Sequence, residues 1–296
     1  MTAVISVEAA LSDHPIIPLW PEGVPGAKAL GPEKVGEGER VSNISEPTLM
    51  LFRPAVDRPN GTAVIIAPGG GYGIVSYARE GVQYANWLSS LGVTCFVLKY
   101  RLAEFGHPAP LQDVLRAVRL VRSQAAEFKI DPARIGVMGS SAGGHLAASA
   151  GTLFDHPAGK TGAPLDAVSA RPDFLILMYP VITMGEPTDH AGSRKNLLGD
   201  HPTPELLKLM SLEKQVTAAT PPTLLIHTQQ DATVPVDNSL VFFQALTRAK
   251  VPAEMYIFER GTHGMGFNPN FGTASDWTSR AAEWLRNRGL LTAVKP

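Results

Sequence analysis

The chain has 296 residues, of which 44% are hydrophobic and 18% are charged, and its formal net charge at pH 7 is −1. This length and apolar content suffice for one large α/β domain with a sizeable core. The near-neutral charge offers no electrostatic basis for binding nucleic acid or an anionic membrane, and we expect neither as a partner. The single cysteine, Cys95, excludes an internal disulfide, and its apolar neighbours predict a small buried side chain.

The N-terminal segment lacks the pattern of a signal peptide. No basic stretch precedes a long apolar run, and no apolar run in the chain has the length needed to span a bilayer. We therefore expect a cytoplasmic protein, or a secreted one if a signal peptide has been removed. Residues 1–45 are rich in proline, glycine and glutamate and show no clear period, which predicts an irregular arm anchored on the domain through 16–20.

From residue 46 onward, strand-like and helix-like segments alternate. Apolar runs predict strands at 49–53, 62–67, 93–98, 134–138, 174–179, 223–227 and 254–258. The first of these is expected to be an edge strand that Pro54 stops. Apolar residues at helical spacing predict helices at 80–91, 110–128, 236–249 and 274–288. Such regular alternation indicates an α/β fold with a mostly parallel central sheet and helices on both faces.

Residues 181–220 depart from this alternation. They are rich in glycine and proline, and only one helical segment, near 205–213, can be recognised. We expect a short, loop-rich insertion that lies over the strand ends as a partial cap. Because no linker or internal repeat divides the chain, residues 46–296 are expected to form a single domain that includes this insertion.

Residues 139–143 read GSSAG and match the G-x-S-x-G pattern of a nucleophile elbow. A predicted strand ends just before the motif, and small residues that can begin a tightly packed helix follow it. In this context Ser141 lies on a sharp turn that presents its hydroxyl to a cleft. The alternative is an ordinary strand-to-helix turn in which Ser141 only caps the helix.

A serine hydroxyl needs a base beside it and a third group that orients the base. Of the eight histidines, His263 is best placed, because glycines flank it in the loop after the last predicted strand. His145 and His227 are rivals that we expect to pack structurally. Asp231, where the strand 223–227 runs out into a turn, is the expected orienting acid. Asp237 is an alternative that looks more like a helix N-cap.

Three consecutive glycines, 69–71, directly follow the predicted strand 62–67. Glycines let backbone N–H groups approach a ligand without a side chain in the way. We expect the N–H groups of Gly70, Gly71 and Ala142 to form an oxyanion hole. A dinucleotide-binding fingerprint is excluded, because Ile74 occupies its last glycine position.

Four side chains flank the proposed loops and are expected to line the substrate side: Tyr72, Tyr77, Met265 and Phe267. No zinc-site or calcium-loop motif is present, and the Asp-His pairs at 189–190 and 200–201 are expected to be solvated rather than metal-binding. The expected chemistry requires neither a metal nor a cofactor.

Together these motifs resemble a carbohydrate-esterase-like branch of the α/β-hydrolases, similar to acetyl xylan esterases and feruloyl esterases. The resemblance extends over about residues 16–288, and it rests on the segments 68–72, 80–81, 98–102, 107–113, 139–147, 179–180 and 261–264. Pro68 stands where the related HGGG motif has histidine. The resemblance implies an α/β-hydrolase fold, whose expected chain order of serine, acid and histidine is met here. It also implies hydrolysis of short acyl esters, such as acetyl groups on xylan-derived sugars.

These observations predict a serine carboxylesterase that works through an acyl-serine intermediate on a small-molecule or oligosaccharide ester. Two other classes stay open. One is a serine peptidase of the prolyl-oligopeptidase type, which turnover of proline-containing aminoacyl substrates would favour. The other is a non-catalytic binding protein on a hydrolase scaffold, which a lack of labelling by a fluorophosphonate would favour. The sequence does not indicate the oligomeric state.

Overall fold

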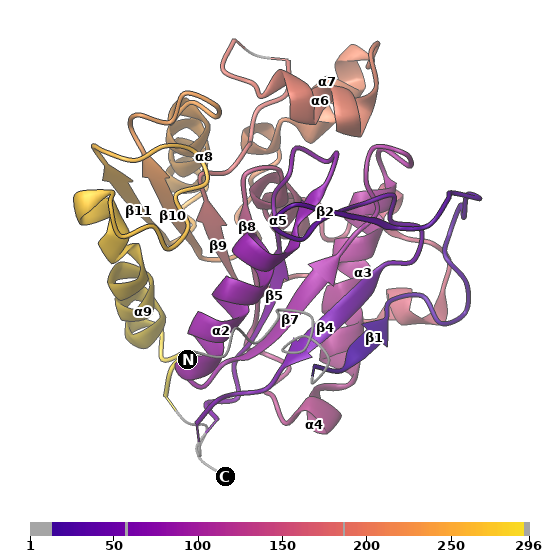
Figure 1. The fold of residues 1–296 in the computed structure, drawn as a ribbon, viewed down its shortest axis with the longest axis horizontal. Helices are drawn as coiled ribbons and strands as arrows, with labels where there is room; N and C mark the ends of the chain where they lie inside the picture. Colours follow the sequence, from indigo (N-terminus) through magenta and orange to yellow (C-terminus); the bar gives the residue numbers. More distant parts are fainter. Residues whose placement is uncertain (1–13, 57–58, 186, 293–296) are drawn as a thin grey trace, which may run out of the picture.

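The computed structural model describes residues 14–56, 59–185 and 187–292. Its centre is an eight-stranded sheet with the strand order β1-β4-β7-β5-β8-β9-β10-β11 (Figure 1). The strands are β1 (Ile16–Pro18), β4 (Thr48–Phe52), β5 (Ala63–Ala67), β7 (Thr94–Lys99), β8 (Ile135–Ser140), β9 (Phe174–Met178), β10 (Thr223–Thr228) and β11 (Ala253–Phe258). Strands β7 to β11 in this order are parallel, and β4 is antiparallel to both of its neighbours. The predicted mostly parallel sheet is confirmed.

Helices cover both faces of the sheet. Helices α2 (Gln83–Ser90) and α9 (Trp277–Asn287) pack on one face, and α3 (Ala109–Ser123), α5 (Ala142–Thr152) and α8 (Asp237–Arg248) pack on the other. Every residue of β5, β8 and β9 is buried. Strands that are covered on both faces need continuous apolar runs, which is why these segments could be recognised in the sequence. Further short helical segments are α4 (Ala125–Phe128), η2 (Pro157–Gly159), η3 (Pro164–Ala167) and η5 (Gly272–Asp276).

From residue 14 onward the N-terminal arm is more regular than expected, while the part of this prediction that concerns residues 1–13 lies outside the described residues. Its strand β1 pairs antiparallel with β4 in the register Ile16↔Met50, so the prediction that 49–53 forms an edge strand is wrong. Two further strands, β2 (Lys34–Gly36) and β3 (Arg40–Ser42), form a hairpin, and β3 also pairs with β6 (Val75–Ser76). Strands of two or three residues are too short to show a period, so only their long-range pairing reveals them.

In its described residues, 181–185 and 187–220, the insertion contains two α-helices rather than one helical segment. Helix α7 (Pro204–Met210) and the following turn η4 (Leu212–Lys214) match the predicted segment, but α6 (Ala191–Leu198) was not predicted. Only Ser193 and Leu197 of α6 are buried, so the helix has no apolar face that a periodicity could reveal. Helices α6 and α7 lie at the top of Figure 1, beyond the strand ends, as expected for a partial cap.

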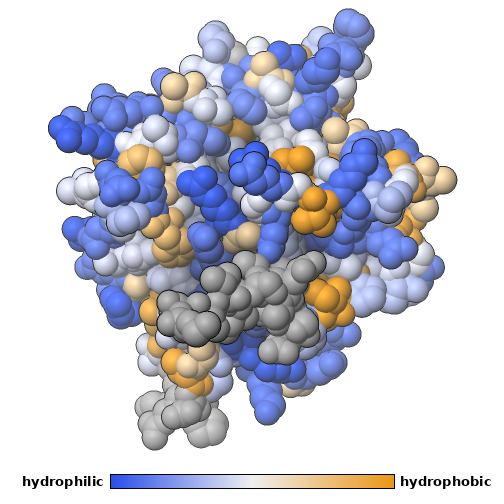
Figure 2. Space-filling model, in the orientation of Figure 1, coloured by the Kyte–Doolittle hydropathy of each residue, from blue (hydrophilic) through white to orange (hydrophobic). Residues whose placement is uncertain are grey.

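The face of the molecule seen in Figure 2 is mainly hydrophilic, and its hydrophobic residues lie singly or in small groups. Isolated apolar residues are normal on a protein surface. Across residues 14–56, 59–185 and 187–292, no helix combines the length and the apolar character needed to cross a membrane.

Candidate active site

Ser141 occupies a sharp turn between β8 and α5. Its backbone has φ 55° and ψ −122°, a conformation that costs a residue other than glycine on the order of 1–3 kcal/mol. The turn is tightly packed: a Cβ on Gly143 would come within 2.0 Å of the carbonyl oxygen of Ala67. The Ser141 side chain makes no capping hydrogen bond to α5, so the turn does not serve merely as a helix cap.

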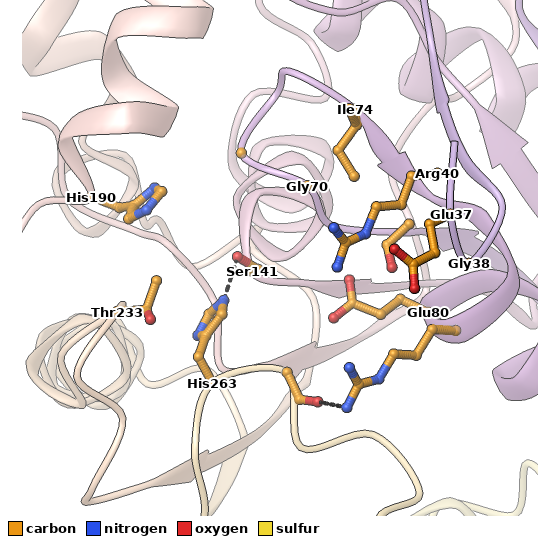
Figure 3. Close-up of a pocket in the computed structure, with 14 residues that line it drawn as sticks. Glu37, Gly38, Arg40, Gly70, Ile74, Glu80, Ser141, His190, Thr233 and His263 are labelled. Carbon is orange, nitrogen blue, oxygen red and sulfur yellow. Dashed lines mark hydrogen bonds between the residues drawn. The ribbon is translucent and has the colours of Figure 1, made fainter. Parts of the chain in front are cut away.

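Three side chains that are far apart in the sequence meet at the carboxyl edge of the sheet. Nε2 of His263 lies 2.8 Å from Oγ of Ser141 (Figure 3). Nδ1 of the same ring lies 2.7 Å from Oδ2 of Asp231. Asp231 follows β10 and His263 follows β11, so both come from loops after parallel strands. This edge is where open α/β sheets build their sites. The three residues expected to form the relay are therefore brought into hydrogen-bond contact.

The surroundings of Asp231 keep its carboxylate ionised. Burial by itself raises its pKa, but hydrogen bonds from His227, from His263 and from the backbone N–H of Val234 together hold the pKa well below the usual range. Oδ1 also accepts the backbone N–H of Thr233 at 2.9 Å. Because an ionised carboxylate can only accept, Nδ1 of His263 must donate to it. Nε2 of His263 is then the basic nitrogen, and it faces the Ser141 hydroxyl.

The two rival histidines lie in the core, as expected. His145 is fully buried between the hydroxyl of Tyr72 and the carbonyl of Met210, each 2.9 Å from a ring nitrogen. Burial lowers the pKa of His145 to about 4. His227 is also fully buried, and its ring nitrogens contact Ser239 Oγ at 2.8 Å and the Val234 carbonyl at 3.0 Å. With both ring nitrogens engaged, neither histidine is free to act as the base.

The backbone N–H groups of Gly70, Gly71 and Ala142 are without acceptors among the hydrogen bonds of the described residues. Gly70 and Gly71 have φ values of 131° and 63°, which an L side chain rarely adopts, and both line the cavity that also exposes Ser141. The Ala142 N–H is the first of α5, where a helix leaves its donors unpaired. Free N–H groups beside a nucleophile can stabilise the oxyanion of a tetrahedral intermediate.

Two side chains for which no role was predicted hold this loop. The buried carboxylate of Glu80 accepts the Gly69 N–H at 2.8 Å through Oε2 and the Tyr179 hydroxyl at 2.8 Å through Oε1. Nδ2 of Asn196, in α6, donates to the Gly71 carbonyl at 2.8 Å. Glu80 lies in η1 (Ala78–Val82), a π-helical turn that leads into α2. Such turns are rare and occur frequently at functional sites, but no sequence pattern reveals them.

Ser141 opens onto a cavity of about 660 Å³. Figure 3 shows it flanked by His190 and Thr233 on one side and by Glu37, Arg40 and Glu80 on the other. The β2–β3 hairpin of the N-terminal arm contributes Glu37 and Arg40, and the cap contributes His190. Burial and the neighbouring His263 lower the pKa of His190, which favours its neutral form. No local sequence pattern indicated that these side chains face Ser141, because only the folded chain brings the arm and the cap to the elbow.

The expected substrate-side residues do not gather in this cavity. Tyr72 and Met265 are each 1% exposed, and Tyr77 is 7% exposed; all three belong to the core, so none of them lines the cavity at Ser141. Phe267 is 38% exposed and lines a neighbouring groove, which it shares with Arg79. The three core residues do flank the loops in sequence, but their side chains point inward, which sequence proximity cannot reveal.

The fold and the elbow define the class of this protein as an α/β-hydrolase. Solved structures agree. The acetyl ester-xyloside bifunctional hydrolase from Caldicellulosiruptor lactoaceticus is 39% identical to this chain, with a TM-score of 0.81 over 93% of this chain and 97% of that one. Residues 49–246 match the family model described as BD-FAE. The chain belongs to the BD-FAE family.

Two curated relatives are longer than this chain. The acetylxylan esterase of Xylanibacter ruminicola is 33% identical over 251 residues, which cover 83% of this chain and 49% of the relative. The endo-1,4-beta-xylanase B of Butyrivibrio fibrisolvens is 41% identical over 206 residues, 68% of this chain and 32% of the relative. The chain thus spans about half or less of the length of these two relatives.

Proposed function

We propose that the protein is a serine carboxylesterase that hydrolyses short-chain acyl esters. The observation that carries this proposal is the relay from Ser141 through His263 to Asp231, with contacts of 2.8 and 2.7 Å. Beside it lie three backbone N–H groups that have no acceptor within the described part of the chain. This arrangement supplies a nucleophile, a base, an orienting acid and an oxyanion hole, which together suffice for acyl transfer.

In the proposed mechanism, Oγ of Ser141 attacks the ester carbonyl while Nε2 of His263 takes the hydroxyl proton. The N–H groups of Gly70, Gly71 and Ala142 stabilise the resulting oxyanion. As the intermediate collapses, His263 returns the proton to the leaving alcohol and an acyl-serine remains. Water, activated by the same imidazole, then releases the carboxylic acid and restores the serine. Asp231 holds the histidine tautomer and stabilises the imidazolium in both steps.

The alcohol part of the substrate is proposed to be a sugar. The side chains that line the cavity at Ser141 are predominantly polar or charged. Ile74 is apolar, whereas four of the lining side chains are acidic or basic: Glu37, Arg40, Arg79 and Glu80. Charged and hydroxyl groups, which offer several donors and acceptors, suit a polyhydroxyl alcohol better than a lipid or an aromatic one. Relatives named acetylxylan esterase and acetyl ester-xyloside hydrolase support acetylated, xylan-derived sugars as the substrate class.

The test compares the wild-type protein with Ser141→Ala on p-nitrophenyl acetate and on acetylated xylose. The wild type should hydrolyse both esters, and the variant should lose at least about 10³-fold in kcat with an unchanged circular dichroism spectrum. A fluorophosphonate should label the wild type at Ser141 and leave the variant unlabelled. Full activity in the variant, or a wild type that neither turns over esters nor takes the label, would disprove the proposal.

A further inference from the structure

A second depression lies next to the cavity at Ser141. It has a volume of about 510 Å³ and is lined by Arg79, Gln83, Asn86, Phe267, Asn268 and Pro269. We call it the Phe267 groove. Arg79 lines both the groove and the cavity, so the two are neighbours that share one wall. A ligand longer than the cavity would therefore meet the groove beyond this arginine.

The aromatic ring that lines the groove is exposed and packs on buried aromatic side chains. Phe267 is 38% exposed. It packs against the rings of Trp277 and Tyr84, whose centroids lie 5.3 and 5.5 Å from its own, and both of these side chains are fully buried. Nε1 of Trp277 donates to the carbonyl of Gly266 at 2.7 Å, which fixes the loop next to Phe267. A ring held in place before a ligand arrives loses little conformational entropy on binding.

Neutral amides surround this ring. Gln83 and Asn86 are exposed and three positions apart in α2, so they lie on the same side of the helix. Among the described residues neither side-chain amide has a hydrogen-bond partner, so their donors and acceptors are available to a ligand. Asn268 adds a third amide. No acidic side chain lines the groove, and its one charged residue is Arg79.

An aromatic face bordered by amides has the chemistry that recognises a neutral sugar ring. The C–H face of the sugar stacks on the ring, while its hydroxyls exchange hydrogen bonds with the amides. Arg79, which lines both depressions, donates one N–H to the Gly264 carbonyl at 2.8 Å, and its guanidinium carries further donors. We propose that the Phe267 groove binds sugar units of an oligosaccharide whose acetylated unit lies at Ser141. This inference rests on the proposed esterase function.

The first test is direct binding, which does not depend on esterase activity. An unacetylated xylo-oligosaccharide is titrated into the wild type, Phe267→Ala, Phe267→Leu and Gln83→Ala/Asn86→Ala, with the fluorescence of the nearby Trp87 and Trp277 as one readout and calorimetry as the other. The wild type should bind saturably. Phe267→Leu, which keeps an apolar contact with the buried rings, and the amide double variant should each bind about tenfold more weakly. The matched control is Ile257→Ala, which removes an exposed apolar side chain of β11 that does not line the groove. This variant should bind like the wild type.

The second test is kinetic and compares kcat/KM on acetylated xylo-oligosaccharides with kcat/KM on acetylated xylose. The wild type should prefer the oligosaccharide, and the Phe267 and amide variants should lose this preference through KM rather than kcat. The inference is overturned if the wild type shows neither binding nor preference, or if the variants bind and discriminate like the wild type. Binding by a wild type that hydrolyses no ester would retain the groove and reject the esterase.

Discussion

The carboxylate of Glu80 accepts the backbone N–H of Gly69 at 2.8 Å, and this contact joins a buried acid to the first residue of the glycine loop beside Ser141. The fit is close, since a Cβ on Gly69 would lie 2.6 Å from Oε2 of Glu80. The other carboxylate oxygen accepts the hydroxyl of Tyr179, whose ring packs edge-on against His263 with centroids 5.0 Å apart. One side chain thus braces both the proposed oxyanion loop and the proposed base.

We expect Glu80→Ala to lower kcat on p-nitrophenyl acetate by roughly 10- to 100-fold with a smaller change in KM, because a misplaced loop weakens oxyanion binding in the transition state more than substrate binding. Glu80→Gln should recover much of this loss, since an amide can accept from Gly69 through its oxygen and donate to Tyr179 through its nitrogen. Glu127→Gln, an exposed substitution in α4, is the matched control. Equal losses in the alanine and glutamine variants would argue against bracing.

Replacing Asp231 by asparagine should reduce kcat on the order of 10³- to 10⁴-fold while KM changes little. An asparagine amide can donate to Nδ1 of His263, which would place the ring proton on Nε2 and leave no basic nitrogen facing Ser141. Steady-state kinetics measures the loss, and a thermal melt checks that the fold persists. A variant that retains more than about a tenth of the wild-type kcat would assign the orienting role to another group.

The burial of His145 predicts a loss of stability in mild acid. Its pKa falls from 6.5 to about 4 on folding, so between these pH values the unfolded chain binds one more proton than the native protein. The contribution of His145 to the free energy of unfolding should therefore not change with pH above 6.5. Below 6.5 the free energy of unfolding should fall by about 1.4 kcal/mol per pH unit as the pH drops toward 4.

Urea unfolding across this pH range tests the effect against His145→Gln, whose side chain does not titrate. His107, whose pKa burial also lowers to about 4, stays in both proteins. The slope of the unfolding free energy against pH should thus be smaller in the variant by the contribution of about one proton, roughly 1.4 kcal/mol per pH unit. It should not vanish. Identical slopes in the two proteins would show that His145 does not carry this dependence.

The packing at the elbow predicts that Gly143→Ala is severely destabilising. Its added Cβ would lie 2.0 Å from the Ala67 carbonyl oxygen, a backbone atom of β5 that cannot move aside without shifting the strand. We expect a loss of about 3 kcal/mol or failure to fold, as for overpacked cores. Gly31→Ala is the control, because the nearest atom to its Cβ is 3.7 Å away and its φ is ordinary. A soluble Gly143→Ala protein that melts with the wild type would contradict this account.

Much of the fold could be read from the amino-acid order because its signals are local. Uninterrupted apolar runs predict buried parallel strands, and the GSSAG turn, the glycine loop and the strand-end positions of Asp231 and His263 each depend on neighbours in the sequence. Parallel strands bring their carboxyl ends to one edge of the sheet, so the sequence predicts that residues at three such ends meet.

What surrounds those residues depended on tertiary structure. Arg40 reaches the cavity because β3 pairs with β6 across more than thirty residues of chain, and His190 reaches it because α6 is held to the glycine loop through Asn196. The sequence placed Glu80 in a helix and gave no sign that it accepts the Gly69 N–H. It predicted Tyr72 to be a substrate contact, whereas the Tyr72 hydroxyl is hydrogen-bonded to His145 in the core. Long-range pairing and the inward or outward direction of a side chain leave no local pattern, because the partners that decide them are distant in the sequence.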